Sequence, residues 1–255
     1  MTYAVAVKQL ETTDASQVRQ ALEALKAQKS PRSTPHIAAR IKAGLPPPLL
    51  LLAIDTIAAL PRGYSSTILL DLITHRSTDV RVRSIEAAAA LNVPGSDRAL
   101  MEALDDGEGE VRTAAVQGLV QIKARRAIPT LFTAFERQVP QAAEALGQLA
   151  GQGDLQRIEG YLDELPFRRI APILRGILSR DDIPDRLKVR IINRLERVNT
   201  ADVSYFLRNY LDDLETAEDD PVRQAVLDTL DALAEAARGE TTEGEPAGEG
   251  EGETP

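Results

Sequence analysis

Histidine is the residue type in this chain best suited to bind a metal or transfer a proton, and only His36 and His75 are present. They lie far apart in the sequence, and neither has a second ligand at the short spacing typical of metal sites. We expect His36 at a helix start and His75 at a helix end, where an imidazolium interacts favourably with the helix dipole. Cysteine is absent, which excludes thiolate ligands, disulfides and a cysteine nucleophile. The sequence therefore predicts no metal and no cofactor.

Acidic residues occur in adjacent pairs, and two carboxylates can perform acid–base catalysis when they converge in a pocket. Each pair lies at the boundary of a predicted helix, where Asp caps helix ends and stabilises turns. The pairs are Asp105-Asp106, Asp181-Asp182, Asp212-Asp213 and Asp219-Asp220. The chain also lacks a phosphate-binding glycine loop, a nucleophile elbow and a zinc-protease motif. We therefore expect a protein that is not an enzyme.

Basic residues are concentrated between residues 166 and 198, where nine Lys and Arg outnumber four Asp and Glu. Four of them recur at helical spacing and form what we call the basic stripe: Arg186, Arg190, Arg194 and Arg197. The stripe can bind an acidic protein partner, the chain's own Glu-rich C-terminal segment or nucleic acid, or it can be a solvated helix face. Nucleic acid is the less favoured ligand, because aromatic residues make up only 4% of the chain and offer few platforms for base stacking.

These candidates must be positioned by helices that recur at a fixed interval. Apolar stripes typical of helices begin 31 residues apart, at Val18, Leu49, Val80 and Val111. A second set of apolar residues recurs at the same interval and marks a further helix after each of these stripes: Ala38, Leu69, Leu100 and Leu131. These first helices are expected at about 34–43, 65–75, 96–105 and 126–136. One helix pair cannot bury its apolar face alone, so successive pairs must stack into a continuous core.

The Val-Arg helix opening, the small residues one and two turns later and the period near 31 resemble bacterial HEAT-like repeats. The similarity is clearest in DGEGEVRTAAVQGLVQI (106–122) and DDPVRQAVLDTLDAL (219–233). It extends to the short repeats of bilin-lyase-type proteins, and it departs at Leu50 and again within 139–187. The resemblance implies an all-α fold, a right-handed α-solenoid of stacked antiparallel helix pairs like HEAT and armadillo superhelices. Such a fold hosts many functions.

Two rows of residues follow the repeat. Basic residues one position after each helix start are expected to pair with acids of an adjacent turn; these repeat bases are Arg19, Arg81, Arg112, Lys188 and Arg223. Polar residues six positions after each start share one face of successive second helices, which line the concave surface in HEAT-like stacks. This concave row, a candidate partner-binding surface or simply a solvated face, consists of Asp55, Glu86, Gln117, Asn193 and Asp228.

We divide the chain into a lead-in (1–14), a repeat domain (15–238) and an acidic tail (239–255). The repeat domain is irregular at 139–187, where two helical segments are expected at about 154–163 and 168–179. The tail is rich in Gly and Glu and is expected to be disordered. Its six glutamates supply most of the net charge of −9. The N-terminus does not resemble a signal peptide, and the apolar run Leu49–Leu60 is too short to span a bilayer, so we expect a cytoplasmic protein that does not enter the membrane.

These observations favour a non-enzymatic scaffold or adaptor that binds another protein, possibly an acidic one, on its concave face. Two alternatives stay open. One is a subunit of a bilin-lyase-like or other modification enzyme, which the resemblance allows. The other is nucleic-acid binding through the basic segment 166–198.

Overall fold

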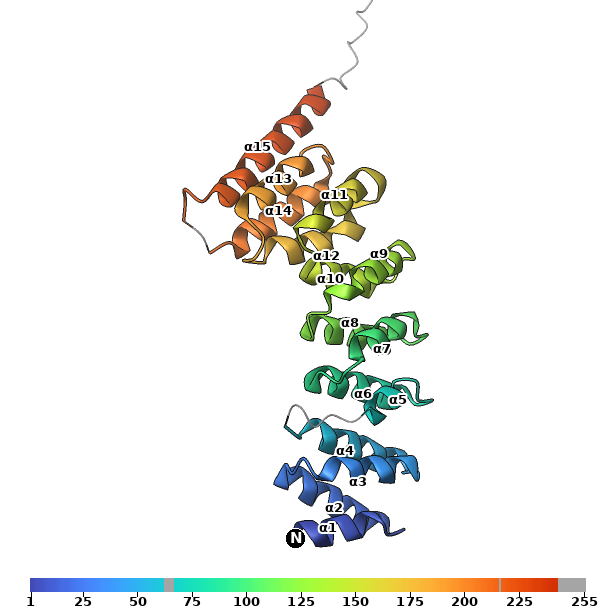
Figure 1. Ribbon diagram of the computed structural model, residues 1–255. Coiled ribbons are helices and arrows are strands. Elements are labelled where there is room, and N and C mark those ends of the chain that lie inside the picture. Colours follow the sequence, from blue (N-terminus) through green and yellow to red (C-terminus); the bar gives the residue numbers. More distant parts are fainter. Residues whose placement is uncertain (62–66, 216, 243–255) are drawn as a thin grey trace, which may run out of the picture. The chain divides into compact units, whose positions relative to one another are not determined.

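The computed structural model describes residues 1–61, 67–215 and 217–242, and every regular element in these ranges is a helix. The helices form two compact units, Met1–Ala150 and Gly151–Pro255, which we call unit 1 and unit 2 and describe separately (Figure 1). The all-α fold of stacked helices expected from the sequence is confirmed. None of the helices in the described ranges combines the length and apolar composition needed to cross a membrane.

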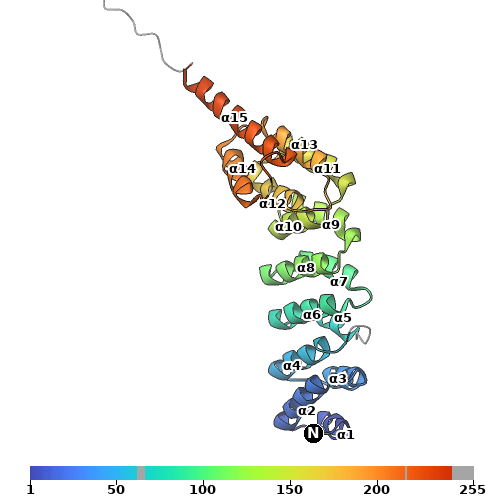
Figure 2. The same cartoon turned by 90° about the vertical axis from the view of Figure 1, so that its left-hand side faces the viewer.

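In unit 1 the chain alternates between two columns of helices (Figure 2). The first column contains α1 (Tyr3–Leu10), α3 (Ser33–Lys42), α5 (Ile68–Leu72), α7 (Ser96–Glu102) and α9 (Ile128–Glu136). Short 3-10 turns, η1 (Ala103–Asp105) and η2 (Arg125–Ala127), follow α7 and precede α9. The second column contains α2 (Ala15–Gln28), α4 (Pro47–Ala58), α6 (Thr78–Leu91), α8 (Gly109–Gln121) and α10 (Pro140–Leu149).

The helices of the second column pack directly on one another, α2 on α4, α4 on α6, α6 on α8 and α8 on α10. The four residues that begin the predicted stripes, Val18, Leu49, Val80 and Val111, are all buried. Later positions of the stripes are filled by small residues such as Ala88, which let neighbouring helices approach closely. The repeat deduced from the 31-residue interval is therefore the repeat by which unit 1 is stacked.

Unit 2 consists of a short 3-10 turn and longer helices. They are η3 (Gln152–Asp154), α11 (Leu155–Glu164), α12 (Phe167–Leu178), α13 (Asp185–Leu195), α14 (Ala201–Asp213) and α15 (Pro221–Thr242). Packing contacts join α12 to α14, α13 to α15 and α14 to α15, which is again a stack of helix pairs. The rings of Phe167 and Phe206 meet edge to face, with centroids 5.4 Å apart, between α12 and α14. Helices α11 and α12 occupy the two segments expected at 154–163 and 168–179.

The structure differs from the expected domain boundaries in three places. Residues 1–14 are not a lead-in, because α1 buries Ala6 and Leu10 and packs against α2 and α3 as the first helix of the stack. The break between the compact units falls at Ala150 and Gly151, inside the segment 139–187 that was expected to be irregular. Helix α15 continues through Thr242, and the remainder of the expected acidic tail, 243–255, lies outside the described residues.

Candidate protein-interaction surface

Three members of the concave row lie on consecutive helices of unit 1: Asp55 on α4, Glu86 on α6 and Gln117 on α8. Arg83 of α6 connects the first two, since its Nε lies 3.3 Å from Asp55 Oδ1 and its Nη1 lies 3.5 Å from Glu86 Oε2. Half of the Arg83 side chain is exposed, so these ion pairs contribute little to stability. The repeat thus places Asp55, Glu86 and Gln117 on one surface of adjacent helices.

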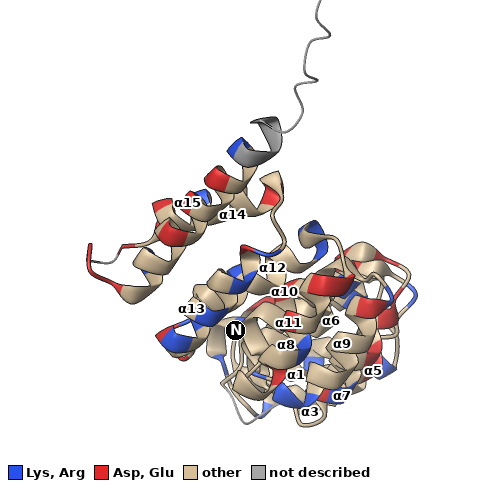
Figure 3. Ribbon diagram, turned by 90° about the horizontal axis from the view of Figure 1, so that it is seen from above, with Lys and Arg blue, Asp and Glu red and all other residues tan. Residues whose placement is uncertain are grey.

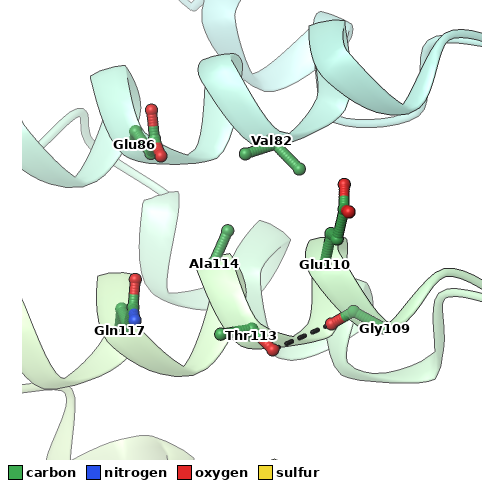
Figure 4. A pocket seen from close by; sticks show the side chains of 7 residues that line it. All are labelled: Val82, Glu86, Gly109, Glu110, Thr113, Ala114 and Gln117. Carbon is green, nitrogen blue, oxygen red and sulfur yellow. Dashed lines mark hydrogen bonds between the residues drawn. The ribbon is translucent and has the colours of Figure 1, made fainter.

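A groove of about 560 Å³ runs between α6 and α8 (Figure 4). Its lining residues are Val82, Glu86, Gly109, Glu110, Thr113, Ala114 and Gln117. Val82 projects from α6 toward α8, while Glu110 and Ala114 project from α8 toward α6. The hydroxyl of Thr113 donates to the carbonyl oxygen of Gly109 at 2.9 Å and so is already satisfied within α8.

A second hollow of about 250 Å³ adjoins the first and extends to α4. It is lined by Leu51, Asp79, Val82, Arg83, Glu86 and Glu110. Because the two hollows share Val82, Glu86 and Glu110, they form one continuous surface. We call this surface, defined by the lining residues of both hollows, the α4–α6–α8 groove.

The groove is acidic and partly apolar. Its charged lining residues are three carboxylates and one guanidinium, and Leu51 and Val82 are partly exposed between them. Asp79 and Glu110 lie in the first turns of α6 and α8, where the helix dipole favours a negative charge. Within the described part of the chain, neither carboxylate forms an ion pair. The groove therefore presents uncompensated negative charge beside aliphatic side chains.

Of the repeat bases, Arg81 has the structural role expected for it. Its guanidinium lies against the carboxylate of Asp106, with Nε 2.8 Å from Oδ2 and Nη2 donating to Oδ1 at 2.9 Å. Nη1 also donates to the carbonyl of His75, at 3.0 Å. Both charged side chains are mostly covered, at 13% and 17% exposure. Arg81 thereby joins the turn before α6 to the turn before α8.

The same contacts change the acidity of Asp106. Burial raises the pKa of this carboxyl, but hydrogen bonds from Arg81 and from the backbone N–H of Glu108 lower it more. The positive charges of Arg81 and Arg112 act in the same direction. The pKa of Asp106 therefore lies below its usual value, and the carboxylate stays ionised as a fixed part of the turn.

The other repeat bases behave differently. Arg112 donates to the carbonyl oxygens of Asp106 at 2.7 Å and Gly107 at 3.0 Å, so it fastens the turn before its own helix. No carboxylate partner is found among the described residues for Arg19, Lys188 or Arg223. The expected pairing with acids of an adjacent turn is therefore seen at Arg81 and does not extend to every repeat.

Only part of the basic stripe is free of ion pairs and available to bind a partner. Arg190 donates to Glu159 Oε1 from Nε at 2.9 Å and from Nη2 at 2.7 Å, and Arg194 pairs with Asp163. Both acids belong to α11, so they neutralise the middle of the stripe that Figure 3 shows on α13. Helix α13 ends at Leu195, before Arg197. Among the described residues, Arg186 and Arg197 form no ion pair.

The last two members of the concave row belong to unit 2. Asn193 on α13 and Asp228 on α15 are both exposed, and their helices pack on each other. The carboxylate of Asp228 accepts a hydrogen bond from Gln224 Nε2 at 2.7 Å. These two members of the row are therefore exposed on neighbouring helices of unit 2, and the structure gives no contact between them.

The histidines and acidic pairs have local structural contacts. His36 lies in the first turn of α3, as expected, with the Tyr3 ring edge-on at 6.4 Å. His75 follows α5, and its Nδ1 accepts a hydrogen bond from the backbone N–H of Ser77 at 3.1 Å. Asp220 caps α15 by accepting the N–H groups of Val222 and Arg223.

Sequence reasoning missed the groove residues other than Glu86 and Gln117. Asp79 and Glu110 stand one position before the apolar stripes begin at Val80 and Val111, and Val82 and Thr113 stand two positions after those starts. Positions three to four residues apart share a helix face, so extending the concave row backwards by two turns would have found them.

Part of the chain matches a known protein family. The family model described as HEAT repeats matches residues 66–147, which contain α5 to α9 and most of α10. This match confirms the resemblance drawn from the sequence. The matched segment includes the groove residues Glu86, Glu110 and Gln117. None of the curated protein sequences is significantly similar to the chain.

Solved structures similar to this chain include natural and designed proteins. The complex of CpcE and CpcF of phycocyanin lyase from Nostoc sp. PCC7120 matches with 18% identity and a TM-score of 0.48, over 91% of this chain and 95% of that one. A designed armadillo repeat protein in complex with the peptide (KR)4 matches with 18% identity and a TM-score of 0.38, over 91% and 100%. Similarity at this level carries no argument about function.

Proposed function

We propose that the chain is a non-enzymatic scaffold that binds another protein through the α4–α6–α8 groove. The observation that carries the proposal is the groove itself, an open hollow of about 560 Å³ between two HEAT-repeat helices, continuous with a second hollow reaching α4. Binding a protein segment there would cover Leu51 and Val82, which are partly exposed. A plainly solvated face needs no aliphatic side chains between its charges.

The helices behind the groove are suited to hold it in shape. Val80, Ile85 and Val111 of α6 and α8 are buried and anchor both helices to the core. The Arg81–Asp106 contact fixes the turn that leads into α8. A surface held by packed helices loses little conformational entropy when a partner binds, which favours affinity.

The test is a substitution that fills the groove with a bulky, uncharged side chain, so its effect does not depend on the charge of the partner. Gln117→Trp places a bulky ring in the groove at an exposed position, and Thr133→Trp places the same ring on α9 in the other column of helices. The full-length chain and both variants are used as bait for affinity purification with quantitative mass spectrometry. We expect Gln117→Trp to lose a protein that wild type and Thr133→Trp retain. Equal recovery by all three baits would contradict the proposal.

A further inference from the structure

The arrangement of carboxylates in the groove points to the chemistry of its occupant. We infer that the α4–α6–α8 groove receives a basic, partly aliphatic segment of a partner protein, with one Lys or Arg side chain held between Asp79 and Glu110. This inference rests on the proposed function, because it names the kind of partner that the same groove binds.

The chain itself shows how a cation is held on this surface. Asp55 and Glu86 occupy equivalent positions, 31 residues apart, on adjacent helices α4 and α6. Arg83 bridges them, with a nitrogen 3.3 Å from the first carboxylate and another 3.5 Å from the second. One guanidinium is thus shared by two carboxylates that come from neighbouring repeats.

Asp79 and Glu110 repeat this arrangement, but no cation of the described chain bridges them. They too are 31 residues apart on adjacent helices, here α6 and α8, and both line the hollow of about 250 Å³, where Arg83 is the one basic lining residue. The part of the chain that the structure describes supplies no ion pair to either. A partner's guanidinium or ammonium group can occupy the place that Arg83 takes between Asp55 and Glu86.

The surroundings of this pair specify more than charge. Leu51 and Val82 line the same hollow, and Ala114 continues the apolar strip between α6 and α8. A Lys or Arg side chain can lay its methylene groups along such residues while its charged end reaches the carboxylates. Aliphatic neighbours in the partner would cover the rest of the strip. An acidic segment would instead meet like charges on both sides.

The experiment measures binding of synthetic peptides to the full chain by fluorescence anisotropy. Three labelled peptides of equal length combine Leu with Arg, with Gln or with Glu. We expect the Arg peptide to bind most tightly and to weaken as NaCl is added, because the attraction is screened. Tighter or equal binding of the Gln or Glu peptide, or no binding of any peptide, would overturn the inference.

A matched pair of variants locates the site. Asp79→Asn combined with Glu110→Gln removes both charges with almost no change of shape, and we expect it to weaken the Arg peptide about tenfold. Asp97→Asn removes a first-turn carboxylate from α7, outside the groove, and should leave the affinity unchanged. Circular dichroism melting checks that both variants are folded. Unchanged affinity in the double variant would overturn the placement of the cation.

The two proposals fail in different ways. If the peptides show no preference for positive charge but Gln117→Trp still loses its partner, the groove remains the docking surface and the basic chemistry is wrong. If Gln117→Trp also keeps every partner, the proposed function is wrong as well.

Discussion

Individual charged side chains in this chain divide into those that stabilise turns and those that face the groove. Arg81 and Asp106 belong to the first kind, since their guanidinium and carboxylate are largely covered and in direct contact. Asp79 and Glu110 belong to the second kind, because they line a hollow and pair with no cation of the described chain. Carboxylates only four residues apart, Asp106 and Glu110, therefore differ in surroundings: the first is fixed in a turn and the second faces the groove.

The Arg81–Asp106 contact predicts a particular dependence of stability on pH. Because the folded-state pKa of Asp106 is lowered, the folded protein binds fewer protons than the unfolded chain, and stability rises with pH. The contribution is fully present above the unfolded-state pKa of about 3.9 and is lost as the pH falls through the lower folded-state value. Asp106→Asn should therefore lower the free energy of unfolding by about 1–2 kcal/mol at neutral pH and progressively less in acid.

Urea unfolding of wild type and Asp106→Asn at a series of pH values measures this difference. Asp71→Asn, an exposed carboxylate on α5, is the control and should change stability little at any pH. A constant difference between wild type and Asp106→Asn across the acid range would show that the ion pair is not its cause.

At the scale of the helices, the close packing of α8 against α6 and α7 depends on a small residue, Gly118. A Cβ atom at Gly118 of α8 would lie 2.8 Å from Leu100 Cδ2 of α7 and 3.3 Å from Ala89 Cβ of α6. Leu100 is fully buried, and in a close-packed interior its side chain can give way only by displacing its neighbours. A glycine is therefore favoured here by packing, although it weakens a helix interior.

Gly118→Ala should lower the free energy of unfolding by about 1–2 kcal/mol, because crowding outweighs the gain in helix propensity. Gly160→Ala on α11 is the matched change, since nothing lies within 4 Å of its added Cβ, and it should raise stability by about 0.5–1 kcal/mol. Thermal or urea unfolding compares the two. Stabilisation by both substitutions would mean that α8 does not pack as closely as described.

The sequence predicted the helices of unit 1 well, because burial repeats with the helical period and Val80 and Val111 carry that signal. It did not predict α1, which precedes the first apolar stripe and has few turns from which to read a period. The sequence also did not predict the ion pair between Arg83 and Asp55. That contact joins two helices and depends on how far the arginine side chain reaches, which the spacing along one helix does not reveal. The partial neutralisation of the basic stripe escaped notice for the same reason.

At the scale of the whole molecule, the chain consists of two compact units with different electrostatics. The groove of unit 1 presents carboxylates, whereas α13 of unit 2 presents arginines that Glu159 and Asp163 partly neutralise. The negative charge in the groove favours a basic partner for unit 1. The expectation of an acidic partner rested on the basic stripe, and it now applies only to Arg186 and Arg197.

A stack in which each repeat contacts its neighbours should respond locally to damage. In native-state hydrogen exchange, Gly118→Ala is expected to reduce amide protection in α6, α7 and α8. Protection in α13, α14 and α15 should stay as in wild type. Equal loss of protection across both units would show that the chain unfolds as one cooperative body.

The face formed by α4, α6 and α8 is the proposed binding surface for another protein. Photo-crosslinking of the full chain in cells tests this proposal directly, with a benzophenone amino acid placed at Gln117 and, separately, at Glu102 of α7 or Thr133 of α9. We expect a crosslink to a defined protein from Gln117 and none from the other two positions. Crosslinks to that protein from Glu102 or Thr133, with none from Gln117, would contradict it.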